Sequence, residues 1–229
     1  MSEGKDKKAG PDSAKMEEIL RERDRIDKLI QERFKKKKTI LFSDVCGYTQ
    51  YMDTWGDIAG RAWIQKHHDI VLPVIKSHDG EVLDIMGDGV MASFPTSLTA
   101  VRASMAIQQG LSEYNAKAEK AQGIHVKIGV NTGEILVDEG HVAGDVVNVA
   151  SRIQNKAGPD QILIDKSVYR EVCGCEDILC RFHGAIQVKG KSAPLELYKV
   201  IWQDEDIILS AEPKVRAREP GTEKGPLSP

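Results

Sequence analysis

The sequence contains no long hydrophobic run, and this absence limits what the chain can be. No apolar stretch reaches the roughly 20 residues that a helix needs to cross a bilayer, and the polar residues 1–8 lack the apolar core of a secretory signal. The formal net charge is only −3, so no excess of positive charge indicates a nucleic-acid or membrane surface. We therefore expect a soluble, cytoplasmic chain without a membrane segment or a nucleic-acid partner.

Cysteine is also scarce. The four cysteines, Cys46, Cys173, Cys175 and Cys180, fit neither the paired C-x-x-C arrangement of zinc sites nor the framework of a small disulfide-rich protein. Reduced thiols in a cytosolic protein are the simpler interpretation. With 229 residues and 41% apolar content, the chain is long enough to bury a sizeable core, and we expect one large domain with extensions.

The first 38 residues are expected to form an extension that precedes this domain. Residues 1–12 are polar and predict disorder, whereas residues 13–38 predict a helical segment. Its apolar residues recur at three- and four-residue steps, at Met16, Ile19, Ile26 and Ile30. This narrow seam fits a short coiled coil and equally a single amphipathic helix lying on the domain. The four lysines at 35–38 are interpreted as a solvated junction.

The domain itself is expected over residues 39–205, where apolar strands alternate with amphipathic helices. The predicted strands span residues 39–45, 81–86, 90–94, 124–130, 134–137, 161–164 and 195–201. The predicted helices span residues 58–77, with a bend near Pro73, 98–118 and 145–156. Gly87-Asp88-Gly89 and Asn131-Thr132-Gly133 are predicted hairpin turns, because glycine takes a positive φ freely. The composition of residues 206–229 predicts a disordered tail.

This order of elements predicts an α+β protein. Two strand–helix–strand units with hairpins favour a mixed sheet with helices packed on it over a doubly wound nucleotide fold. Two aspartates stand out within it, because Asp44 ends the first apolar strand and Asp88 occupies a hairpin tip, each close to a glycine. Carboxylates fixed at strand ends hold Mg²⁺ well, and nearby glycines let phosphate approach the backbone. The pattern indicates a metal site that binds a nucleoside triphosphate.

Asn148 and Arg152 follow one helical turn apart, and each of these features alone is weak. Together they resemble the catalytic domain of the class III nucleotidyl cyclases. The matching segments are FSDVCGYT at 42–49, GDGVMASF at 87–94, GDVVNVASR at 144–152 and VKGK at 188–191. The resemblance covers about residues 39–200. It implies that family's ferredoxin-like or palm-type mixed sheet with packed helices.

The resemblance also implies an activity and its catalytic groups. A homodimer would convert ATP or GTP to the 3′,5′-cyclic monophosphate and pyrophosphate, with Asp44 and Asp88 from one protomer and Asn148 and Arg152 from the other in each site. Two Mg²⁺ or Mn²⁺ ions would be bound at Asp44, Val45 and Asp88. Such a pair of ions lowers the pKa of the attacking 3′-hydroxyl and neutralises the triphosphate.

The substrate contacts are implied in the same way. The backbone N–H groups at the start of the helix after the first strand would face the phosphates, and they belong to Cys46, Gly47, Tyr48 and Thr49. Asn148 would orient the ribose, and Arg152 would stabilise charge that develops on the α-phosphate. Lys189 would hold the terminal phosphates, although a solvated loop charge is the alternative for this lysine.

The match breaks at the base-selecting positions. Adenylate cyclases of this family typically carry Lys and Asp or Thr where this chain has Asp84 and His141. A carboxylate at Asp84 can accept both donors of guanine while a His141 N–H reaches O6. Adenine also fits if Asp84 accepts from N6 and His141 donates to N1, which reverses the usual roles of the two positions. Cytosine's amino group would also satisfy Asp84, and the alternative for Asp84 is a position that only flanks the metal site. The sequence leaves the purine open.

A different class of function also stays open, namely a non-catalytic, cyclase-like module that binds nucleotide or dimerises. The unusual base-selecting pair fits that alternative. Because the chain retains both aspartates, Asn148 and Arg152, we expect an enzyme. A diguanylate cyclase is disfavoured, since Gly89-Val90-Met91 follows Asp88 in place of that family's signature.

Overall fold

The computed structural model describes residues 11–138, 141–187 and 193–203. The strands are β1 (Lys35–Val45), β2 (Glu81–Met86), β3 (Gly89–Phe94), β4 (Val126–Asp138), β5 (His141–Ala143), β6 (Ile162–Asp165), β7 (Leu179–Ile186) and β8 (Leu195–Ile201). The helices are α1 (Pro11–Phe34), α2 (Tyr48–Ser77), α3 (Ser97–Asn115), α4 (Asp145–Gln154) and α5 (Lys166–Val172), with a 3₁₀ turn η1 (Lys120–Gln122). The expected disorder at the two ends falls almost entirely outside the described residues.

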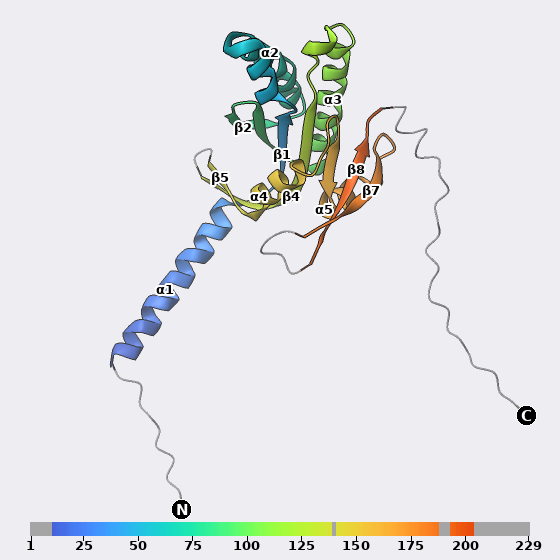
Figure 1. The fold of residues 1–229 in the computed structure, drawn as a ribbon. Coiled ribbons are helices and arrows are strands. Elements are labelled where there is room, and N and C mark those ends of the chain that lie inside the picture. The colour runs from blue at the N-terminus through green and yellow to red at the C-terminus, as the bar shows by residue number, and fades with distance from the viewer. Residues whose placement is uncertain (1–10, 139–140, 188–192, 204–229) are drawn as a thin grey trace, which may run out of the picture.

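The strands form one eight-stranded sheet in the order β2-β3-β1-β4-β6-β8-β7, with β5 paired to β4 (Figure 1). β4 and β6 run parallel, and the other paired strands run antiparallel. The segment β1-α2-β2-β3-α3-β4, in sheet order β2-β3-β1-β4, is a ferredoxin-like unit. The predicted α+β class and mixed sheet are confirmed.

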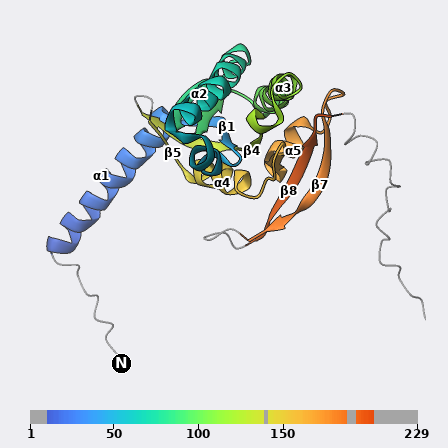
Figure 2. The same ribbon diagram turned by 45° about the horizontal axis from the view of Figure 1, so that its top comes forward.

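The sheet carries helices on both faces (Figures 1 and 2). Successive residues of a strand point to opposite faces, and β1 shows what each face packs against. Leu41 belongs to the large core under α2, α3 and α5, together with Val101 and Val168. Its neighbour Ile40 packs with Val146 and Ala150 of α4 on the opposite face. The α2–α3 face holds most of the core, and the α4 face is covered less completely.

The predicted hairpin turn at Asn131-Thr132-Gly133 is wrong, because β4 runs straight through these residues. Asn131 and Gly133 serve the packing of α4 instead of a turn, whereas the Thr132 hydroxyl accepts a hydrogen bond from Thr39 of β1. The Asn131 Nδ2 donates a hydrogen bond to the Val146 carbonyl at 3.1 Å. A Cβ on Gly133 would lie only 2.7 Å from Val146 Cγ2. The glycine therefore makes room for the start of α4.

A second glycine of β4 makes room for the end of α4. A Cβ on Gly129 would lie 2.2 Å from the backbone nitrogen of Gln154 and 2.7 Å from the carbonyl oxygen of Ala150. Because these are backbone atoms, a side chain at Gly129 could be accommodated only by moving the helix. The two glycines thus fix α4 against β4 at both of its ends.

Helix α2 also differs from the prediction. It begins at Tyr48 instead of residue 58, and its interruption lies at Gly56. Gly56 has φ 81° and ψ 170°, a conformation that few residues other than glycine adopt. The predicted bend near Pro73 is replaced by this break, and the helix continues past Pro73 to Ser77. The first two turns of α2, directly after β1, therefore form a separate segment.

Helix α1 extends away from the sheet instead of lying along the domain (Figure 1). Its apolar side chains are exposed in the single chain, namely Met16, Ile19, Leu20, Ile26, Leu29 and Ile30. Strand β1 starts at Lys35, earlier than predicted, because the backbone of the four lysines pairs with residues 133–136 of β4. Among the helices that the structure describes, none is both long and apolar enough to cross a membrane.

The substitution Gly129→Ala is expected to destabilise the fold by about 1–3 kcal/mol, because its Cβ would overlap the backbone of α4. Gly174→Ala is a matched control, since a Cβ there meets nothing within 4 Å. Urea unfolding of the two variants and the wild type measures the difference. Equal stability of the two variants would contradict the close packing of α4 on β4.

Candidate active site

Asp44 and Asp88 come together through the pairing of β1 with β3. Asp44 is the second-last residue of β1 and lies opposite Gly89, the first residue of β3, in the register of the two strands. Asp88 directly precedes Gly89 in the turn from β2. A Cβ on Gly89 would lie 3.7 Å from Asp44 Oδ1, so this oxygen faces the turn that carries Asp88.

The two carboxylates influence each other electrostatically. Burial raises the pKa of Asp88, and the negative charge of Asp44 raises it further. Two carboxylates in a half-buried position repel one another, and a bound cation relieves this repulsion. Among the described residues, no group of three or more His, Cys, Asp or Glu side chains is placed to hold a metal. A pair of carboxylates suits Mg²⁺, which commonly combines one or two carboxylates with water and phosphate oxygens.

Lys127 is a site residue that the sequence analysis missed. It lies opposite Asp44 on β4, and its Nζ is 2.9 Å from Asp44 Oδ2. Burial alone lowers the pKa of Lys127, but the hydrogen bond and the charge of Asp44 outweigh burial and raise it. The lysine is therefore charged and offsets part of the repulsion between the aspartates. The only sign of Lys127 in the sequence is that it is a charged residue between two apolar residues of a predicted strand, Val126 and Ile128.

A second donor to Asp44 comes from α4. Gln154 is buried, and its Nε2 lies 3.4 Å from Asp44 Oδ2. No sequence motif points to this residue either. Both donors approach the same oxygen, on the side away from Gly89.

The backbone after β1 leads directly into α2, as the predicted phosphate contacts require. Gly47 precedes the helix with φ 79° and ψ 17°, and the first N–H groups of α2 have no acceptor within the helix. The Cys46 N–H donates to the His125 carbonyl at 2.8 Å and is already used within the chain. The amides of Gly47, Tyr48 and Thr49 are the ones left for the predicted phosphate contacts.

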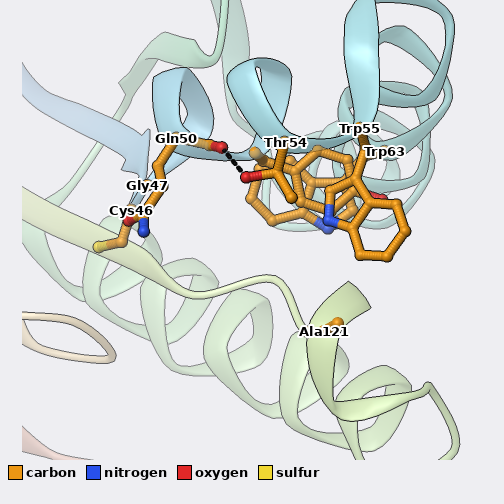
Figure 3. Close-up of a pocket in the computed structure, with 9 residues that line it drawn as sticks. Cys46, Gly47, Gln50, Thr54, Trp55, Trp63 and Ala121 are labelled. Carbon is orange, nitrogen blue, oxygen red and sulfur yellow. Dashed lines mark hydrogen bonds between the residues drawn. The ribbon is translucent and has the colours of Figure 1, made fainter.

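A pocket of about 270 Å³ adjoins this loop (Figure 3). Cys46 and Gly47 border it on one side, and Trp55 and Trp63 form its aromatic wall. Neither Asp44 nor Asp88 lines it. The two carboxylates thus lie outside this pocket.

Asn148 and Arg152 project from the outer side of α4. The buried side of the helix consists of Val146, Val149, Ala150, Ile153 and Gln154, whereas Asn148 is exposed and Arg152 is half-buried. At about 100° per residue, Asn148 and Arg152 share one face, and that face lies roughly 120–160° around the helix from Gln154. Within one chain, the side of α4 that reaches Asp44 is therefore not the side that carries Asn148 and Arg152.

The other predicted substrate residues are only partly described. Asp84 is exposed on β2, opposite Met91, and Met91 lies opposite Phe42 of β1, so the three form one row on the α4 face. One oxygen of Asp84 accepts the Ile85 N–H at 2.8 Å. His141 belongs to β5, but its side chain lies outside the described part of the structure, as does all of Lys189.

Asp88→Asn is expected to raise the melting temperature of the metal-free protein. A raised pKa means that ionised Asp88 costs stability, and this cost grows as pH rises through the folded-state pKa. The gain from Asp88→Asn should therefore be largest near pH 7 and shrink as acid protonates the wild-type carboxyl. Thermal melts in a chelating buffer, from neutral to acid pH, measure this.

Asp44→Asn is the matched comparison and should change the melting temperature less than Asp88→Asn does. It removes the charge paired with Lys127, which stabilises the fold by about 1 kcal/mol, but it also removes the charge that repels Asp88, so the two effects oppose each other. An Asp88→Asn protein that melts below the wild type at pH 7 would contradict the repulsion between the carboxylates.

Comparisons with known proteins identify the family of this domain. Residues 30–201 match the family model described as the adenylate and guanylate cyclase catalytic domain. A protein of Rhizobium meliloti, named as a presumed adenylate cyclase, is 30% identical over 181 residues, which are 79% of this chain and 29% of that protein. An adenylate cyclase of Anabaena cylindrica is 29% identical over 184 residues, 72% of this chain and 37% of the relative.

The match to solved structures covers the domain in the same way. An adenylate/guanylate cyclase/hydrolase from Silicibacter pomeroyi is similar with a TM-score of 0.64 and 27% identity, over 73% of this chain and 97% of that one. The chain spans only a minor part of the length of the curated relatives it matches. It belongs to the family of adenylate and guanylate cyclase catalytic domains.

Proposed function

We propose that the protein is a nucleotidyl cyclase that converts ATP or GTP to the 3′,5′-cyclic monophosphate and pyrophosphate, at sites shared by two protomers. The observation that carries the proposal is the pair Asp44 and Asp88 beside the start of α2, with Asn148 and Arg152 on the outer side of α4. Family membership supports the activity. The four cysteines form no disulfide, in line with a reducing cytoplasm where these nucleotides occur.

Each residue near the carboxylates then has a role. Asp44 and Asp88, with Val45, would hold two Mg²⁺ or Mn²⁺ ions, which lower the pKa of the 3′-hydroxyl and neutralise the triphosphate when bound. The amides of Gly47, Tyr48 and Thr49 bind the β- and γ-phosphates at the positive end of α2. Lys127 adds a fixed positive charge that attracts the triphosphate. Lys189 is proposed to hold the terminal phosphates.

The second protomer supplies Asn148 to orient the ribose and Arg152 to stabilise charge on the α-phosphate. The surface around the carboxylates supports this assembly. Apolar side chains of the α4 face are only partly buried in the single chain, namely Phe42, Leu83, Met91 and Val147, and Met86 is 48% exposed. Apolar patches of this kind mark interfaces between proteins, and a second copy of the chain would cover this one.

Helix α1 is proposed to pair with its copy in a short parallel coiled coil. Its exposed apolar side chains recur at the spacing of a helical seam, and α1 leaves the domain just before β1. The helical part of residues 13–38, up to Phe34, would then form the dimerisation segment, and the catalytic domain would begin with β1 and extend to about residue 205. Pairing there would set the relative rotation of the two catalytic domains.

The purine remains a choice between two substrates. Asp84 faces the same side of the sheet as Phe42 and is available to accept guanine's donors, whereas the relatives compared above include adenylate cyclases. The same departure at Asp84 and His141 favours the second candidate function, a cyclase-like module that binds nucleotide without turnover. Incubation with Mn²⁺ and each of the four ribonucleoside triphosphates distinguishes them, because the module releases no pyrophosphate from any.

Mixed dimers test the shared site. Asp44→Asn and Arg152→Ala proteins should each lose at least about 100-fold of the activity, because both sites of each dimer lack one group. Co-expression should restore about a quarter of the wild-type activity, since half of the dimers are mixed and each mixed dimer has one intact site. Pyrophosphate release is the measurement. No restoration, with an active wild type, would contradict the shared site.

The double substitution Asp84→Lys with His141→Asp tests the base pocket. It should raise the ratio of kcat/KM for ATP over GTP by at least about tenfold, because a donor opposite adenine replaces an acceptor that suits guanine. Cyclic products are identified by mass. Glu81→Lys, an exposed charge change on the same strand, should leave the ratio unchanged. A double variant with the wild-type ratio would show that these residues do not select the base.

A further inference from the structure

We propose that Gln154 is a positioning residue that orients Asp44 for metal binding. Helix α4 then sets the metal affinity of the carboxylates of its own protomer, and it presents Asn148 and Arg152 to the site that contains the aspartates of the second protomer. This inference rests on the function proposed above. Gln154 would not touch the nucleotide, and it acts only through Asp44.

The contacts of Asp44 divide between its two oxygens. Oδ2 receives the Gln154 amide at 3.4 Å and the Lys127 ammonium at 2.9 Å. Oδ1 lies on the other side, toward Gly89 and the turn of Asp88. Because two donors hold one oxygen, the carboxylate keeps a single orientation and presents the second oxygen to Asp88. Partners of this kind, one step behind a metal ligand, orient that ligand.

Gln154 is able to impose this orientation because its own position is fixed. Its side chain is 5% exposed, and its backbone nitrogen lies so close to Gly129 that no Cβ fits between them. The opposite end of α4 is tied to β4 by the hydrogen bond from Asn131 to the Val146 carbonyl. A buried amide on a helix fixed at both ends is well placed to restrict the orientation of its acceptor, in addition to the partly buried Lys127.

The two sides of α4 then serve two different sites. Gln154 contacts the Asp44 of its own chain, whereas Asn148 and Arg152 lie roughly 120–160° around the helix from it. A substitution at Gln154 should therefore affect the site to which its own chain gives the aspartates. It should leave the metal requirement of the other site unchanged.

The first test measures metal binding without nucleotide. Gln154→Met keeps the length and apolar volume of the buried side chain but removes the donor, and Ile153→Val is a control that trims the adjacent buried residue without touching Asp44. Paramagnetic resonance of free Mn²⁺ gives the dissociation constant. We expect about tenfold weaker binding for Gln154→Met and wild-type binding for Ile153→Val. Unchanged or tighter binding for Gln154→Met would overturn the inference.

The second test uses the mixed dimer of Asp44→Asn and Arg152→Ala chains, whose one intact site takes its aspartates from the Arg152→Ala chain. Gln154→Met placed on that chain should raise the Mn²⁺ concentration for half-maximal activity about tenfold, and saturating Mn²⁺ should restore most of the rate. On the Asp44→Asn chain it should leave that concentration unchanged. A general loss of folding would lower the maximal rate from either chain.

The outcomes separate the two proposals. If the mixed dimer is inactive, or if Asp44→Asn binds Mn²⁺ like the wild type, the proposed function fails and the inference falls with it. If the mixed dimer is active but Gln154→Met has the same effect from either chain, the proposed function survives and the role of Gln154 is wrong.

Discussion

The candidate site is governed by the repulsion between two half-buried carboxylates, Asp44 and Asp88, which the pairing of β1 with β3 brings close together. Burial and the charge of Asp44 both raise the pKa of Asp88, so this corner of the sheet is unfavourable without a compensating positive charge. Lys127 supplies part of that charge from β4. The repulsion thus lowers the stability of the folded state at the place where a cation and a triphosphate are expected. Such a local loss of stability is common at functional sites.

Helix α4 links this part of the sheet to the proposed dimer. Glycines at 129 and 133 let the helix lie directly on β4, and this contact brings Gln154 within reach of Asp44. The same rigid placement turns Asn148 outward. One side of this short helix therefore contacts Asp44 of its own protomer, and the other side faces the proposed partner. A single chain that carries all four proposed catalytic groups would then be unable to assemble them into one site.

The sequence predicted the parts of the fold whose signals are local. The strand that carries Asp44 and the hairpin with Asp88 in its turn are confirmed, because apolar runs flanked by glycine indicate strands and turns. Asn131-Thr132-Gly133 misled the prediction, because a glycine needed for close helix packing looks the same as a glycine needed for a turn. Strand β7 and helix α5 were missed, since β7 is mostly exposed and α5 has only seven residues. Lys127 and Gln154 act through contacts that only the folded chain reveals.

The most direct test of the account is a crystal structure of the dimer with Mn²⁺ and a non-reactive nucleotide analogue, with the ions located by anomalous scattering. We predict manganese bound by the oxygens of Asp44 and Asp88, with the analogue's triphosphate beside the start of α2 and α4 of the second protomer facing its ribose. Asp44 and Asp88 without an ion, or a nucleotide bound entirely within one protomer, would contradict the account.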